Sequence, residues 1–321
     1  MIKETMKYHK KIDIVLENIS KVMIGKQDET VLSLVALLAQ GHVLFEDVPG
    51  VGKTMLVRAL AKSLDCDFRR IQFTPDLLPS DITGISIYNP KEMEFEYRPG
   101  PLLGNVVLAD EINRSSPKTQ SSLLEGMEEK RVTVDGNTVL LQRPFFVMAT
   151  QNPVEFEGTY PLPEAQLDRF LLKLKLGYPT LEEELEMLER TTKNHPIESL
   201  QSVISKAELI TLQEEVKEIY IDQSIQWYIL KLVSSTRNHH AIHFGASPRA
   251  SIALMKASQA FAFVKGRDYV LPDDVKYLTP FVLSHRITLT HEATYDGVDR
   301  EQTIVSIIKN TNIPIRRKFS G

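Results

Sequence analysis

The amino-acid sequence predicts an α/β fold: a parallel sheet between layers of helices, followed by a smaller all-helical domain. Three short apolar runs are each followed by a polar or glycine-rich loop, as in buried parallel strands whose carboxyl ends carry chemistry. Later in the chain, helix signals follow one another. At 321 residues the chain has room for about two domains of 100–200 residues each. The three expected strands cover residues 42–45, 106–109 and 145–149.

The elements before residue 180 build the expected core domain. Apolar residues at helical spacing predict two helices over about residues 1–40, ending at Gly41. Ser116-Pro117 provides an N-cap and a proline at the first helical position, which opens a helix through Met127. Two segments exceed a minimal core, residues 81–104 and 130–143, and Asp135-Gly136-Asn137 in the second predicts a hairpin turn.

The remainder of the chain predicts the helical domain. Thr180 with Glu183 and Ser205 with Glu208 have the spacing of capping boxes. We therefore expect a core domain over residues 1–180 and a helical domain over residues 181–321. The expected helices cover about 180–193, 205–220, 222–237, 247–265 and 272–284.

Composition excludes several classes of protein. Hydrophobic residues make up 42% and charged residues 25%, as in ordinary globular proteins, so a largely disordered or fibrous chain is not indicated. No run approaches the roughly 18 apolar residues of a membrane span, and the N-terminus lacks the apolar stretch of a signal peptide. We expect a cytoplasmic protein. The net charge of −4 argues against a dedicated nucleic-acid binder, which is usually basic.

The sequence from Glu46 to Thr54 predicts a phosphate-binding loop. It follows an expected strand and opens an expected helix, which is the context that this motif requires. Gly50 and Gly52 let backbone N–H groups turn toward an anion at the helix N-terminus. Lys53 is placed to reach the β- and γ-phosphates, and Thr54 to ligate Mg²⁺. We also expect the neighbouring residues Pro49, Val51 and Met55 to contact the nucleotide.

The loop departs from the GxxxxGK[ST] consensus at its first position, where Asp47 replaces glycine. Aspartate tolerates left-handed backbone angles better than most residues. We expect its carboxylate to point away from the phosphates and to leave the site intact.

Polar residues at the ends of the second and third strands complete the expected site. Asp110 is placed to hold Mg²⁺, and Glu111 to activate the attacking water. Asn152 can orient the same water, although an asparagine before proline also suits a simple turn. Arg169 and Arg249 are candidates for contacting phosphate, and Arg114 is a weaker one. Chemistry alone leaves open whether each arginine forms a surface ion pair instead.

Taken in order, the motifs GVGKT, LADEINR, ATQNP, LPEAQLDRF and GASPRA resemble those of the AAA+ superfamily of P-loop NTPases, and in wording those of its MoxR family. The match covers about residues 20–310, and Asp47 is similar to the family's usual form. The resemblance implies a P-loop αβα core with a helical lid, ATP or ADP with Mg²⁺ as cofactors, and hydrolysis of ATP.

The resemblance also implies individual roles. Lys53 and Thr54 would belong to Walker A, and Asp110 and Glu111 to Walker B. Asn152 would be sensor 1, Arg169 an arginine finger acting on a neighbouring subunit, and Arg249 sensor 2. The segments 81–104 and 130–143 would be the helix-2 insertion and the hairpin before sensor 1, which face the pore or the substrate in relatives.

By the same resemblance, the partners would be further copies in a hexameric ring, a protein client that the ring assembles or activates, and a protein with a von Willebrand factor A domain. An alternative is a nucleic-acid motor or loader of the same clade, which the acidic charge and the few basic residues of the hairpin disfavour. A GTPase is disfavoured because no Asn/Thr-Lys-x-Asp segment is present.

Several remaining residues predict no function. Cys66 cannot form an internal disulfide and suits a small buried position. His239, His240 and His243 fit a solvated loop better than a metal site. Residues 316–318 fit a solvated basic tail.

Overall fold

The computed structural model describes residues 8–152, 158–191 and 196–313. Its centre is a five-stranded sheet with strand order β2-β5-β8-β1-β9, in which all neighbouring strands are parallel. All carboxyl ends of the strands therefore lie at one end of the sheet, the carboxyl end, and all their starts at the other, the amino end. The strands are β1 (Val43–Glu46), β2 (Phe68–Gln72), β5 (Val106–Asp110), β8 (Phe146–Gln151) and β9 (Leu172–Leu174).

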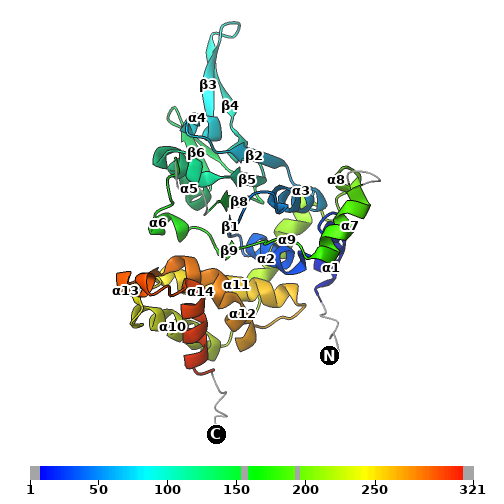
Figure 1. Ribbon diagram of the computed structural model, residues 1–321. Helices are drawn as coiled ribbons and strands as arrows, with labels where there is room; N and C mark the ends of the chain where they lie inside the picture. Colours follow the sequence, from blue (N-terminus) through cyan, green and yellow to red (C-terminus); the bar gives the residue numbers. More distant parts are fainter. Residues whose placement is uncertain (1–7, 153–157, 192–195, 314–321) are drawn as a thin grey trace.

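Helices cover both faces of this sheet (Figure 1). Alternate side chains of β1 point to opposite faces, as in any strand. Val43 and Phe45 pack with helices α1–α3, whereas Leu44 packs in a second cluster with α5. The predicted αβα core is confirmed. The helices of this region are α1 (Lys10–Ser20), α2 (Gln27–Leu38), α3 (Lys53–Ser63), α4 (Pro79–Thr83), α5 (Pro117–Glu129) and α6 (Glu164–Leu167).

The two additional segments of the core each form an antiparallel hairpin. Strands β3 (Gly84–Asn89) and β4 (Glu94–Pro99) build a long hairpin that projects from the molecule in Figure 1. Strands β6 (Arg131–Val134) and β7 (Asn137–Leu140) build the second, and Asp135 and Gly136 in its turn have positive φ angles. The hairpin that the Asp-Gly-Asn turn predicts is therefore present.

The part of the chain after β9 is mainly helical, as predicted. It also contains a short antiparallel pair, β10 (Ile242–Phe244) with β11 (Thr288–Leu289), which the sequence analysis did not predict because both strands are too short to show a period. The helices are α7 (Leu181–Thr191), α8 (Pro196–Ser199), α9 (Lys206–Lys217), α10 (Gln223–Arg237), α11 (Pro248–Val264), α12 (Pro272–Leu283), α13 (His291–Tyr295) and α14 (Arg300–Asn310). Among the described residues, 3₁₀ turns occur at Pro101–Leu103 (η1), Ile112–Arg114 (η2) and Ser284–Arg286 (η3).

The helical region, called the lid below, packs directly against the core. Leu209 and Leu212 of α9 belong to the same hydrophobic cluster as α1–α3, as does Leu254 of α11. Placing the domain boundary at residue 180 remains our proposal. In the described ranges, no helix is long and apolar enough to cross a membrane. The basic residues 316–318 and the last two residues of the helix expected over 180–193 lie outside the described residues.

Candidate nucleotide-binding site

The loop between β1 and α3 has the geometry of an anion cradle. Gly50 and Gly52 have φ angles of +86° and +96°, which side chains rarely adopt and glycine adopts freely. A methyl group added at Gly50 would meet no atom within 4 Å, so positive φ alone requires glycine there. Lys53 and Thr54 open α3, whose free N–H groups favour negative charge.

Lys53, the first residue of α3, lines the cavity beside this loop. Its Nζ donates to the backbone oxygens of Asp47 at 3.1 Å and Val48 at 2.7 Å. Burial lowers the pKa of Lys53, and the carboxylates of Asp47, Asp110 and Glu111 oppose that change. The cation is thus held beside the cavity by neutral carbonyls, which leaves it available to an anionic ligand.

A cavity of about 440 Å³ opens above the loop at the carboxyl end of the sheet. It collects residues from the loop and from the ends of β2, β5 and β8. Of the residues predicted to bind nucleotide, Val51 is not among the described residues around this cavity; it packs instead against the hydrophobic core. The cavity is lined by Asp47, Pro49, Gly50, Gly52, Lys53, Thr54, Met55, Arg58, Arg70, Gln72, Asp110, Glu111, Thr150, Gln151 and Asn152.

Asp47 replaces the usual glycine without pointing its charge at the phosphate position. Its Oδ1 accepts from the N–H of Val48 at 2.8 Å, and its Oδ2 accepts from the N–H of Gly177 at 2.7 Å. Gly177 lies in the segment between β9 and α7, with φ +64°. The carboxylate therefore joins the phosphate-binding loop to the start of the lid.

Asp110 and Glu111 lie side by side at the end of β5. Thr150 of β8 donates from Oγ1 to Asp110 Oδ1 at 2.7 Å and accepts from the N–H of Glu111 at 2.8 Å. Glu111 has a φ of +57°, a left-handed conformation that is uncommon outside glycine and asparagine. Arg114 contacts the Glu111 carboxylate at 3.2 Å.

Strand β2 contributes two residues to the cavity that were not predicted, Arg70 and Gln72. Arg70 donates to Asp110 Oδ2 at 2.7 Å and to Gln72 at 2.6 Å, and Gln72 donates to Glu111 Oε2 at 2.9 Å. Strand β2 (FRRIQ) carries charged residues and was not recognised as a strand. The signal that could have found them is its alternation, because Arg70 and Gln72 are two residues apart and share one face.

The two predicted arginines lie elsewhere. Arg169 precedes β9, and Leu171 donates its N–H to His42 O at the start of β1, which places Arg169 at the amino end of the sheet. Glu128, near the end of α5, contacts Arg169 at 2.8 Å and Arg249 at 3.1 Å. The hydrogen bond from Arg169 lowers the pKa of Glu128, and the charges of both arginines add to this. Neither arginine is among the described residues that line the cavity.

The remaining candidates are easily placed. Asn152 is buried beside the cavity. Burial raises the pKa of the Cys66 thiol to about 12, so this residue stays protonated. Among the described residues, no group of three or more histidine, cysteine or acidic side chains is arranged to hold a metal ion.

Comparisons with known proteins agree with this geometry. Residues 42–172 match the family described as "ATPase family associated with various cellular activities (AAA)", and residues 234–308 match an AAA lid domain. The chain is 63% identical over 302 residues to the uncharacterised protein YeaC of Bacillus subtilis, covering 94% of each chain. It is 42% identical over 305 residues to the chaperone MoxR1 of Mycobacterium tuberculosis, covering 92% of this chain and 80% of that protein.

A solved structure is also similar. The crystal structure of a candidate ATPase from Cytophaga hutchinsonii superposes with a TM-score of 0.89 at 44% sequence identity, covering 94% of each chain. The likeness therefore extends over both the sheet and the helical lid.

Proposed function

The chain belongs to the MoxR family of AAA+ ATPases, and from that premise we propose that it is one subunit of a cytoplasmic, ring-forming remodelling chaperone. Each subunit would bind ATP with Mg²⁺ at the carboxyl end of its sheet. The arginines at its amino end would complete the site of the neighbouring subunit. The free energy of hydrolysis would then drive a change in a protein client.

One observation carries this proposal: the residues that we propose for one hydrolytic site lie at opposite ends of the same sheet. His42 lies beside the Arg169 segment, and Glu46 lies where the phosphate-binding loop begins. The two residues are four positions apart along the chain through β1, which is a distance of about 13 Å at roughly 3.3 Å per residue. Arg169 and Arg249 contact Glu128 and thus lie away from the described lining of the cavity in their own subunit. A closed ring repeats one head-to-tail interface, which would bring the amino end of one sheet to the cavity of the next.

Within a subunit, the residues around the cavity fit a nucleoside triphosphate and a divalent cation. The positive-φ glycines, the N-terminus of α3 and Lys53 would hold the phosphates, and the Thr54 hydroxyl and the Asp110 carboxylate would hold Mg²⁺. The bound cation would neutralise charge that develops on the phosphate oxygens. Glu111 would take the proton of the attacking water, and Gln72 and Asn152 would fix the positions of the carboxylate and the water.

The projecting β3–β4 hairpin is our candidate for contact with the client. Tyr88 and Phe95 stack edge to face near its tip, and Met93 beside them is 78% exposed. Exposed apolar side chains gathered at the end of an extended element commonly mark a protein interaction site. A hexameric ring, and a partner with a von Willebrand factor A domain, belong to the same proposal.

The dependence of ATP turnover on protein concentration tests the shared site. An arginine finger raises the rate by roughly 10³–10⁵ in well-studied NTPases, so turnover per subunit should rise steeply as subunits assemble. The transition should coincide with the appearance of rings in sedimentation or mass photometry. Turnover per subunit that stays constant from dilute monomer to assembled ring would contradict the proposal.

A further inference from the structure

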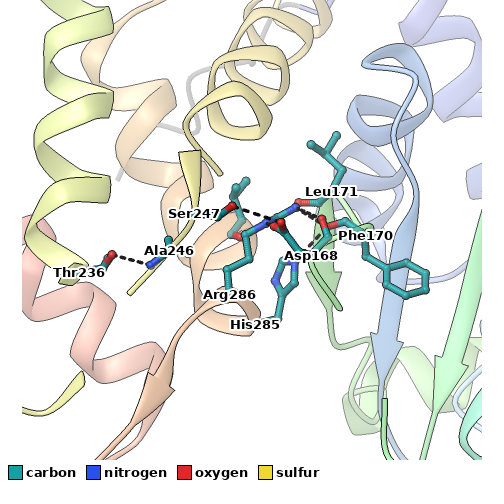
Figure 2. A network of polar contacts seen from close by, with 9 residues as sticks. Asp168, Phe170, Leu171, Thr236, Ala246, Ser247, His285 and Arg286 are labelled. Carbon is teal, nitrogen blue, oxygen red and sulfur yellow. Dashed lines mark hydrogen bonds and ion pairs between the residues drawn. The ribbon is translucent and has the colours of Figure 1, made fainter. Parts of the chain in front are cut away.

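A network of polar contacts between the lid and the core surrounds the Arg169 segment, and Arg286 of the lid lies at its centre (Figure 2). Arg286 ends η3, directly after α12, and its side chain is 3% exposed. Its Nε donates to Asp168 Oδ1 at 2.6 Å. A guanidinium buried to this degree is retained only where its charge and its five N–H groups find partners.

The remaining N–H groups of Arg286 hold the backbone on both sides of Arg169. Nη2 donates to the carbonyl oxygens of Asp168 at 3.1 Å and Phe170 at 2.6 Å, and Nη1 donates to that of Leu171 at 3.2 Å. Nη1 also donates to the Val282 carbonyl within the lid. A single lid side chain thus holds three peptide carbonyls, those of residues 168, 170 and 171, in the core segment that carries the arginine.

Two further lid residues act on the same segment. His285 Nε2 donates to the Phe170 carbonyl at 3.0 Å, and Ser247 Oγ donates to Asp168 Oδ2 at 3.2 Å. Ser247 precedes α11 and is two residues from Arg249, the other arginine that Glu128 contacts. The lid therefore holds the backbone at Arg169 and also supplies the second arginine of the pair.

We propose that Arg286 is a positioning residue for the Arg169 finger, so that the lid sets where this arginine lies relative to the nucleotide of the neighbouring subunit. This rests on the proposed function, in which Arg169 acts across a subunit interface. Lysine cannot replace Arg286, because an ammonium is a compact charge with three donors and lacks the planar fork that reaches several carbonyls at once. Arg286→Lys should keep the charge beside Asp168 and lose the hold on the peptide groups.

The experiment compares Arg286→Lys with Arg267→Lys in the full chain. Arg267 is the matched control: it donates to both carboxylate oxygens of Asp274, at 2.8 and 2.6 Å, wholly within the lid. A catalytic group misplaced by about 1 Å can lose roughly 10²-fold in rate. Turnover of assembled Arg286→Lys should therefore fall by about 10²-fold with ADP affinity unchanged, whereas turnover of Arg267→Lys should stay near the wild-type value.

Mixing separates a misplaced finger from general damage. Arg286→Lys subunits have an intact Glu111, so adding Glu111→Gln subunits, whose fingers are intact, should restore turnover. Adding Arg169→Ala subunits should not, because neither partner then supplies a finger. Wild-type turnover of Arg286→Lys, or a loss that Glu111→Gln subunits do not rescue although they rescue Arg169→Ala, would overturn the role of Arg286.

Mixing Glu111→Gln with Arg169→Ala subunits distinguishes a failure of the shared site from a failure of the role of Arg286. If Glu111→Gln subunits fail to rescue Arg169→Ala itself, the shared site is wrong, and the role of Arg286 is wrong with it. Should Arg286→Lys not fold, Ser247→Ala removes only the hydrogen bond to Asp168 Oδ2. The Ser247→Ala variant should lose less turnover than Arg286→Lys and should be rescued by the same subunits. Wild-type turnover of Ser247→Ala would then overturn the proposal that the lid positions Arg169.

Discussion

The carboxyl end of the central sheet gathers acids and a phosphate-binding loop around a cavity, whereas its amino end gathers two arginines, one from the core and one from the lid, that contact Glu128. The first end holds the phosphate-binding loop, and its cations among the described residues are Lys53, Arg58 and Arg70, of which Arg70 is paired with Asp110. The second end holds Arg169 and Arg249, which contact Glu128 and lie away from that loop. In the proposed ring, each end would meet its opposite on another copy of the chain.

The largest expected effect is at the amino end. Arg169→Ala should lower turnover of the assembled protein by roughly 10³–10⁵-fold, because a finger stabilises charge in the transition state. Its affinity for ADP, measured by calorimetry on the unassembled subunit, should be unchanged, since Arg169 lies away from the cavity. Weakened binding of ADP to single subunits would show that the two ends are not separate.

The matching change at the carboxyl end is Glu111→Gln. Loss of a general base costs about 10²–10⁴-fold, and the amide keeps the size of the side chain. Turnover should fall by that amount while ATP remains bound, which a fluorescent ATP analogue would report. A variant that hydrolyses ATP at the wild-type rate would remove Glu111 from the mechanism.

A smaller effect, on the pH dependence of folding stability, tests whether the amino end of the sheet excludes water from His42. His42 Nδ1 accepts from the N–H of Val147 at 3.0 Å, and Nε2 donates to Met127 O at 3.4 Å, so the ring is neutral. Burial lowers the pKa of His42 from 6.5 to about 4. As the pH falls, His42 binds a proton in the unfolded chain before it does so in the folded chain. The neutral, buried ring therefore contributes its full share of the stability above pH 6.5, and this share is lost as the pH falls toward 4.

The lost stability should be about 3 kcal/mol, at 1.36 kcal/mol per pKa unit. Chemical unfolding of the wild type and of His42→Gln at about pH 7 and pH 4.5 measures it, and the variant should depend less on pH. Equal pH dependence in the two proteins would show that His42 is not buried as described.

The smallest expected effect concerns Glu128, which holds the two arginines side by side. A hydrogen bond to a charged group contributes about 1.5–3 kcal/mol, so Glu128→Gln should lower turnover of the ring by roughly tenfold. Glu129→Gln is the control, because Glu129 pairs with the exposed Arg131 instead. Equal turnover in the two variants would show that Glu128 does not orient the arginines.

The sequence predicted the fold class, three strands, most helices and the loop at Lys53, because each has a strong local pattern. Strand β2, and with it Arg70 and Gln72, was missed because the strand is short and three of its five residues (FRRIQ) are polar or charged. Strand β9 and the β10–β11 pair are too short to show a period. The separation of Arg169 from the cavity depends on strand order and direction, and the contacts of Arg286 join residues more than 100 positions apart. Neither follows from local sequence.

The most direct test of the shared site is to mix Glu111→Gln subunits with Arg169→Ala subunits, each inactive alone, and to measure ATP turnover. In a randomly mixed ring of head-to-tail interfaces, about a quarter of the sites would combine an intact Glu111 with an intact neighbouring Arg169. We therefore predict recovery of roughly that fraction of wild-type turnover. A mixture that stays as inactive as its components would contradict the account.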